Sequence, residues 1–276
     1  MNGPQKRSYT LLIGLVLVVL LVTSAVGADW LAPFDPYKVD ISRVMEPPSW
    51  EHPFGTDYLG RDVLSRVIHG GRISLAIGVI AVLIAGVVGT LIGSVAGFAG
   101  GWIDEVLMRL TDIVFAFPTA LFALAVMAVF ENPTVTKIFI VLGLVGWAGI
   151  ARLVRAEVMA IKERDYVTAA RAIGLGRVRI VTVHILPNTV GTLSVALTLG
   201  VAGNILTEAW LSFLGLGAQP PVPSWGAMIT EGQFYLTSRP WACVFPGLAI
   251  LLTVLGFNML GDGLRDVLDP RLKRRL

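Results

Sequence analysis

Polar side chains that could act on a substrate are rare within the apolar parts of this sequence. Asn204 and Glu208 lie near the end of a long apolar stretch, where polar groups are costly and often functional. Glu208 could face a transport pathway and contact a substrate amine, or it could lie at the membrane interface. Gln219 and Trp225, in the Gly- and Pro-rich segment that follows, are candidates for an outer gate. The residues themselves leave these roles open.

Most other chemistry lacks suitable residues. The chain has one cysteine, Cys243, and its three histidines, His52, His69 and His184, do not have the spacing of metal ligands. No lysine follows a glycine, so a phosphate-binding Gly-x-x-x-x-Gly-Lys loop is absent and we expect no bound cofactor. Most basic residues flank apolar stretches, which argues against nucleic-acid binding despite a net charge of +3.

The composition is typical of a membrane protein. Of 276 residues, 55% are hydrophobic and 15% are charged, and the mean hydropathy is +0.74. A bilayer core about 30 Å thick needs about 20 apolar residues per helical crossing. Because the apolar runs are continuous rather than alternating, we expect an all-α polytopic membrane protein. Six transmembrane helices are predicted, at 9–28, 74–97, 113–130, 138–151, 185–207 and 241–261.

Two prolines and a set of glycines affect these predicted helices. Pro118 in the third span and Pro246 in the sixth are expected to kink their helices. The fourth span is short and must extend towards Arg155. In the second span, three glycines are spaced four residues apart, which favours close helix packing but also permits a pathway lining. These glycines are Gly89, Gly93 and Gly97.

Basic residues predict the orientation. With the amino terminus inside, 15 Lys and Arg residues fall in inner segments and 7 in outer ones. Cytoplasmic segments carry this excess, so both termini are predicted to be cytoplasmic. The first span has a competing interpretation as a cleavable signal peptide, because Lys6 and Arg7 precede it and the small residues Ala25 and Gly27 lie near its end. The length of the apolar run favours retention.

The sequence divides into two parts. Residues 1–73 hold the N-terminal tail, the first span and an outer segment rich in Pro and aromatic residues, predicted to be an ordered cover. Residues 74–276 form a core with five spans, a basic inner loop at 152–187 and an outer re-entrant segment at 211–240. A charged loop in so apolar a chain indicates that something outside the membrane contacts it.

A short helix is predicted within the inner loop. Asp165 can cap its start, and Gly174 can supply the left-handed conformation that ends it. Positions i, i+3, i+4 and i+7 form one small apolar face, with Arg171 on the same helix. The face consists of Tyr166, Ala169, Ala170 and Ile173. Such a helix can dock on a partner protein or lie at the lipid surface, and periodicity alone does not choose.

The loop resembles that of permeases of ATP-binding cassette (ABC) importers. That family carries a Glu-Ala-Ala, Gly and Leu-Pro signature, which Ala169-Ala170, Gly174 and Leu186-Pro187 match in part. Thr168 stands where the acidic residue usually lies, and His184 where isoleucine is often found. Four segments are similar to the second permease of dipeptide and oligopeptide importers: FGTDYLGRDVLSR at 54–66, LSFLGLGAQPP at 211–221, PSWG at 223–226 and LGDGLRDVLDP at 260–270.

The resemblance implies a type I ABC importer permease fold with a cytoplasmic coupling helix, in a bacterial inner membrane. In that family the helix docks on an ATPase subunit. Its counterparts here are Asp165, Tyr166, Ala169, Ala170, Arg171, Ile173 and Gly174. The implied partners are a second homologous permease in a heterodimer, two ATP-binding subunits that use ATP and Mg²⁺, and a periplasmic or lipid-anchored substrate-binding protein.

The implied cargo is a di- or oligopeptide, with nickel or glutathione as alternatives in the same family. A self-sufficient secondary transporter would need the carboxylate or histidine relays that the spans lack, although Glu208 keeps that hypothesis open. An intramembrane enzyme would need a nucleophile beside its base or a metal pair, and the candidates are dispersed. A permease subunit that does not itself hydrolyse ATP is therefore the favoured interpretation.

Overall fold

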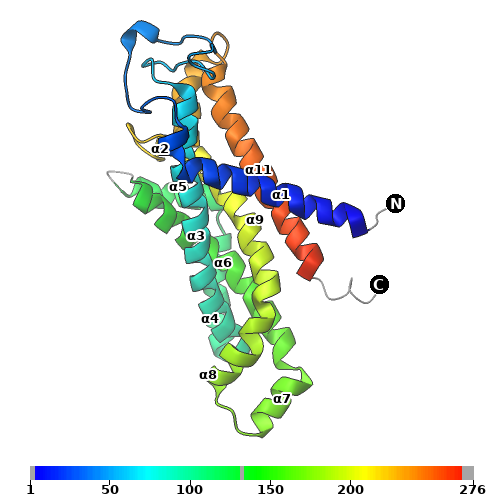
Figure 1. Cartoon of the computed structure of the whole chain (residues 1–276). Coiled ribbons are helices and arrows are strands. Elements are labelled where there is room, and N and C mark those ends of the chain that lie inside the picture. Colours follow the sequence, from blue (N-terminus) through cyan, green and yellow to red (C-terminus); the bar gives the residue numbers. More distant parts are fainter. Residues whose placement is uncertain (1–3, 131–133, 269–276) are drawn as a thin grey trace.

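The computed structural model describes residues 4–130 and 134–268, and within them it contains helices and loops but no strand (Figure 1). Five helical stretches are long and apolar enough to cross a membrane. They are α1 (Pro4–Val26), α3 (Val63–Ala99), α6 (Val135–Lys162), the stretch Arg177–Phe213 that includes α9 (Leu186–Phe213), and α11 (Trp241–Leu268). The basic residues counted between 271 and 275 lie outside the described part, as do the last two residues of the motif at 260–270.

The third predicted span is not one straight helix. Residues 113–130 were predicted to form one span kinked at Pro118, and in the structure α4 (Gly101–Phe115) and α5 (Thr119–Ala128) meet at an angle of 84°. Pro118 lies at the break. It interrupts the helix because it lacks a backbone N–H and disfavours helical geometry in the residue before it. Counted as one bent span, the pair completes the predicted six. Pro246, by contrast, lies inside α11, which continues as one helix.

Two spans extend well beyond their apolar cores. The second begins at Val63, where the Asp62 carboxylate accepts a hydrogen bond from Ser65 N, so the division predicted between residues 73 and 74 falls inside α3. The fourth continues to Lys162, which supplies the length that its short apolar core lacks. Hydropathy finds the part of a helix that lies in lipid, but charged turns at its ends belong to the same helix.

The two central helices, α3 and α6, pack backbone to backbone. A Cβ atom on Gly89 would lie 2.7 Å from Trp147 O, and one on Gly97 would lie 2.8 Å from Arg155 O. On Gly93 it would lie 2.9 Å from Val154 Cβ. The packing role that the glycine spacing predicted is therefore confirmed, because no larger residue fits at this distance. A buried cluster including Ile77, Ala81, Val141 and Leu142 extends the same contact.

Helix α1 crosses α11 at the side of the molecule (Figure 1). Gly14 and Gly263 allow the two backbones to approach, since a Cβ on Gly263 would lie 2.7 Å from Leu11 Cα. Gly256 contacts the same helix near Leu17. The first span is thus packed against the last.

The two ends of the bundle differ in structure. At the cap end lie α2 (Ala28–Leu31), an irregular segment with η1 (Ile41–Arg43), and α10 (Trp225–Gly232) followed by η3 (Gln233–Tyr235). At the opposite loop end lie α7 (Asp165–Ala172), α8 (Arg177–Arg179) and the π-helix η2 (Ile180–Ile185), which continues into α9 (Figure 1).

We expect Gly93→Ala to destabilise the protein, because its methyl group would press on Val154 and the backbone of α6. Overpacking of this kind costs about 1–3 kcal/mol. Gly203→Ala on α9 is the matched control, since no atom lies within 4 Å of its added Cβ. Thermal melting of the purified protein, monitored by size-exclusion chromatography, measures the difference in stability between the two variants. Equal melting temperatures for the two variants would contradict the packing role.

Candidate functional site

The N-cap of the loop-end helix α7 lies one residue earlier than the sequence predicted. Asp165 was expected to be the N-cap, but the N-cap is Arg164, which makes no side-chain capping bond. The backbone carbonyl of Arg164 instead accepts hydrogen bonds from Val167 N at 2.9 Å and Thr168 N at 3.1 Å. The Asp165 carboxylate lies in the first turn, where a negative charge interacts favourably with the helix dipole.

The end of α7 is as predicted. Gly174 has a φ of +81°, a left-handed conformation that residues with a Cβ avoid. Leu175 N donates to Ala170 O at 3.1 Å, which closes the helix with a Schellman turn. The turn fixes the direction in which the chain leaves α7 towards α8.

The apolar face predicted for α7 is divided between two sides. Val167 and Ala170 are buried, in a cluster that also contains Val158 and Ile180. Tyr166 is 41% exposed and Ile173 is 79% exposed. Ala169 and Arg171 are also exposed. The prediction that Ala170 shares a face with the other three residues was wrong, because α6 and η2 cover that side of the helix. An exposed apolar edge, formed by Tyr166, Ala169 and Ile173, remains.

The helices next to α7 are braced by polar contacts. Arg155 on α6 pairs with Asp104 on α4, with Nη2 and Oδ2 2.6 Å apart. Lys162 Nζ at the end of α6 donates to Gly97 O of α3 at 2.8 Å. The end of α6 that leads into α7 is therefore bonded to both α3 and α4.

At the cap end, the segment 54–66 forms a tight turn around Asp57. Its Oδ1 accepts hydrogen bonds from Leu59 N at 2.8 Å and Arg61 N at 3.0 Å. Gly60, with a φ of +71°, packs so closely on Asp40 that a side chain there would overlap the Asp40 carbonyl. The segment therefore forms a polar turn directly before α3, and Asp62 caps that helix as well as pairing with His52.

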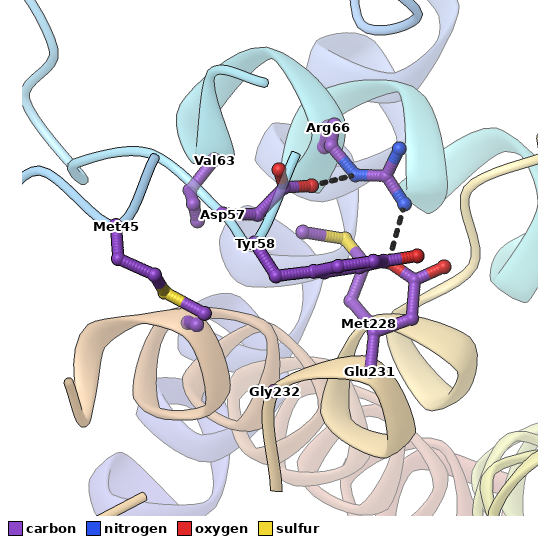
Figure 2. A pocket seen from close by; sticks show the side chains of 9 residues that line it. Met45, Asp57, Tyr58, Val63, Arg66, Met228, Glu231 and Gly232 are labelled. Atoms are coloured by element: carbon purple, nitrogen blue, oxygen red, sulfur yellow. Dashed lines mark hydrogen bonds and ion pairs between the residues drawn. The ribbon is translucent and has the colours of Figure 1, made fainter. Parts of the chain in front are cut away.

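Four charged side chains meet beneath this turn: Arg61, Asp57, Arg66 and Glu231, of which Figure 2 shows the last three. Arg61 Nε lies 2.7 Å from Asp57 Oδ2, and its Nη2 lies 2.9 Å from Glu231 Oε2 on α10. Arg66 Nη2 approaches the same Glu231 oxygen at 3.0 Å. All four side chains are at most 15% exposed, and the charges balance. No local feature of the sequence indicates the pairing of Arg61 with Glu231, which is 170 residues away.

The cavity beside this cluster is too small for a substrate. Its volume is about 10 Å³, close to the space that one water molecule requires. Tyr58, Met45 and Met228 close it (Figure 2). The cluster therefore holds α10 against α3 and is not a binding site.

Glu208 and Trp225 do not have the positions expected of pathway or interface residues. Glu208 is 0% exposed, and its Oε1 accepts hydrogen bonds from Ser212 Oγ at 2.8 Å and Ser224 Oγ at 2.9 Å. Trp225 is 2% exposed, and its Nε1 donates to Val67 O at 2.8 Å. Ser224 also caps α10 by accepting from Ala227 N. These residues fasten the start of α10 to α9 and α3, so within this chain neither side chain lines a pathway.

The other two candidates remain accessible. Asn204 is partly buried on α9, and Gln219 is exposed in the loop before α10. Gln219 Nε2 donates to the carbonyls of Gly215 and Gly217, both at 3.0 Å, and so orders the loop. A pathway role stays a prediction for both residues. Between residues 4 and 268, apart from 131–133, no three His, Cys, Asp or Glu side chains are grouped to hold a metal ion.

Two family models match the chain. One, described as the binding-protein-dependent transport system inner membrane component, matches residues 89–274. The other, described as the N-terminal TM domain of oligopeptide transport permease C, matches residues 6–48. The second match covers the span α1, and the first covers the spans α6, α9 and α11 together with α7.

Named relatives match almost the whole chain. The dipeptide transport system permease protein DppC of Alkalihalophilus pseudofirmus is 41% identical over 268 residues, covering 97% of this chain and 88% of that protein. The glutathione transport system permease protein GsiD of Escherichia coli is 44% identical over 269 residues, with the same two coverages. GsiD of Shigella boydii shows the same identity.

We expect Glu231→Gln to destabilise the protein strongly, because two buried guanidinium groups would lose a shared carboxylate. Removing one partner of a buried ion pair costs about 3–5 kcal/mol. Glu51→Gln, which removes an exposed carboxylate from its pair with Arg43, should change the melting temperature little. Similar shifts in the two variants would contradict a structural role for the buried cluster.

Glu208 should need its acceptor oxygen rather than its charge. In Glu208→Gln, a side-chain oxygen can still accept from Ser212 and Ser224, so we expect stability close to that of the unmodified protein. Glu208→Leu leaves both hydroxyl groups unpaired in a buried site, at about 1–3 kcal/mol. Melting temperatures of the two variants test this. A Gln variant as unstable as the Leu variant would show that the charge itself is required.

Proposed function

Because this chain belongs to the family of binding-protein-dependent transport system inner membrane components and is a permease subunit of an ABC importer, we propose that it moves di- or oligopeptides across the membrane. The observation that carries this cargo class is the similarity to a dipeptide permease across 97% of the chain. The match of its first span to the oligopeptide permease C model supports the same class.

Glutathione is the second candidate. The relatives named as glutathione permeases are 44% identical, against 41% for the dipeptide permease. Glutathione is itself a small peptide, so both cargoes would present similar amide and carboxylate groups to the pathway. Sequence identities of 41% and 44% to the two kinds of permease are too similar to distinguish a dipeptide from glutathione as the cargo.

We propose that the exposed apolar edge of α7 docks on a separate ATP-binding subunit, which uses ATP and Mg²⁺. The small Ala169 side chain on this edge permits close approach, and Tyr166 and Ile173 offer apolar contact area. The first-turn Asp165 adds charge beside it, whereas Arg171 lies on the other side of the helix, over the ring of Phe98 of α3. Gly174 fixes the orientation of the helix. The sequence contains no phosphate-binding loop of its own, which supports a separate source of energy.

The proposed assembly holds this chain in a heterodimer with a second homologous permease, two ATP-binding subunits and a periplasmic or lipid-anchored binding protein. In the 18-residue apolar window of the stretch Arg177–Phe213, 22% of the residues are buried, against 44% in that of α3, which supports a partner beside α9. Closure of the ATP-binding subunits would move α7, and the contacts of α6 with α3 and α4 would rock those helices together. Asn204 and Gln219 remain candidates for contact with the cargo.

We propose a location in the bacterial inner membrane with both termini cytoplasmic. The excess of 15 basic residues in the segments predicted to be inside over 7 in those predicted to be outside supports this orientation. The close packing of α1 against α11 at Gly14 and Gly263 supports retention of the first span rather than cleavage. The cap end would then face the binding protein.

A bulky charge on the exposed edge of α7 should uncouple transport. We expect Ala169→Arg to reduce ATP-dependent uptake about ten-fold in the reconstituted importer, because it blocks close docking. Ala169 is preferable to the buried Ala170, whose replacement would disturb the core. Thr168→Arg is the control, since Thr168 is exposed but lies about 100° around the helix. Equal uptake by both variants, at equal insertion, would exclude docking through this edge.

Cargo class can be separated from coupling by competition. Uptake of a labelled dipeptide into proteoliposomes holding the complete importer should fall when unlabelled di- or tripeptide is added in excess. Glutathione that competes more strongly than any simple peptide would favour the second candidate instead. If neither peptides nor glutathione stimulated ATP hydrolysis, both cargoes would be contradicted. The docking of α7 is tested separately, by the Ala169→Arg variant.

A further inference from the structure

An open cavity lies at the loop end, on the side of α7 that faces the membrane helices. Its volume is about 680 Å³, and its walls come from the end of α3, the end of α6, α7, and the start of the stretch Arg177–Phe213. It is unrelated to the exposed edge of α7, which consists of other residues. Its volume is sufficient for the polar headgroup of a lipid, unlike that of the single-water cavity at the cap end.

The rim of this cavity is cationic. Lys162, Arg171 and Arg177 line it, and Glu163 is the one acidic residue among its lining side chains. Arg171 lies over the ring of Phe98, with its guanidinium carbon 5.5 Å from the ring centre, and Lys162 Nζ donates to the Gly97 carbonyl. These contacts hold two of the three cations at the mouth of the cavity. An anionic ligand is favoured over a neutral one by this balance.

One wall of the cavity is apolar and continues along a membrane helix. Val95 and Phe98 of α3 line the cavity together with Val178 and Val181. From Val95, an exposed apolar stripe runs along α3 at every fourth residue. Its members are Val79, Leu83, Val87, Leu91 and Val95, with exposed fractions of 39%, 55%, 62%, 63% and 51%. At 1.5 Å per residue, the part from Val95 to Val87 spans about 12 Å, close to one leaflet of hydrocarbon.

We propose that this cavity binds an acidic phospholipid of the loop-end leaflet, with the phosphate at Arg171 and Arg177 and one acyl chain along the α3 stripe. The cationic rim of the cavity fits a phosphate group, and the adjacent apolar stripe fits an acyl chain. A phospholipid carries both groups, whereas a free anion carries only the first. A soluble phosphate or an acidic protein loop would use the cations and leave the stripe uncovered. The lipid would brace α7 against α3 from the side opposite the docking edge.

Lipid retention by the full-length chain tests the proposal without transport. The chain is purified, placed in nanodiscs of equal parts phosphatidylglycerol and phosphatidylcholine, and released for native mass spectrometry. We expect phosphatidylglycerol to be retained in preference. The double variant Arg171→Gln/Arg177→Gln should lower its retention about five-fold for each cation removed. The control is Arg164→Gln/Arg179→Gln, which removes two exposed cations of the same loop that do not line the cavity.

A second variant tests the acyl-chain part of the site. Leu91→Asn on the stripe should reduce phosphatidylglycerol retention but leave binding of inorganic phosphate unchanged. Equal losses in the cavity variant and the control would overturn the proposal, as would equal retention of the two lipids. Retention by the isolated chain but not by the assembled importer would show that a protein partner occupies the cavity instead, and would also overturn it. Because no assay uses ATP or cargo, these outcomes are independent of the proposed function.

Discussion

The close approach of α3 and α6 is the contact on which the rest of the molecule depends. In lipid there is no hydrophobic drive to bring two apolar helices together, so van der Waals packing must do so. Gly89, Gly93 and Gly97 permit backbone contact, and each faces backbone or Cβ atoms of α6. Because α6 leads directly to α7, the position of the loop-end helix is set by this pairing.

The cap end uses charge where the membrane core uses shape. Arg61, Arg66, Asp57 and Glu231 are buried together, and burying them is favourable only because each charge has a partner of opposite sign. Glu231 closes one end of α10, and the bonds of Ser224 and Trp225 close the other. A helix fixed at both ends forms a firm cover over α3 and α9. These four charged residues are therefore structural.

The loop end combines a rigid attachment with two different surfaces. Val167 and Ala170 join α7 to the core, while Tyr166, Ala169 and Ile173 remain exposed on one edge. The cationic cavity opens on the other side, between α7 and α3. A short helix can thus be contacted from two directions without rearrangement of its own hydrogen bonds. That geometry suits an element that transmits movement, because its fixed side and its contact side are separate.

Local features of the sequence determined the class of protein, the six apolar spans, the left-handed Gly174 and the glycine spacing that brings α3 to α6. Each depends on neighbours within a few residues, either through hydropathy or through backbone conformation. Only the tertiary structure decided that α4 and α5 meet at 84°, that Ala170 is buried beside Val167, and that Glu208 and Trp225 are enclosed. The physical reason is that burial and pairing depend on which surface lies opposite. Glu231 pairs with Arg61, which is 170 residues away in the sequence, and no local pattern predicts this contact.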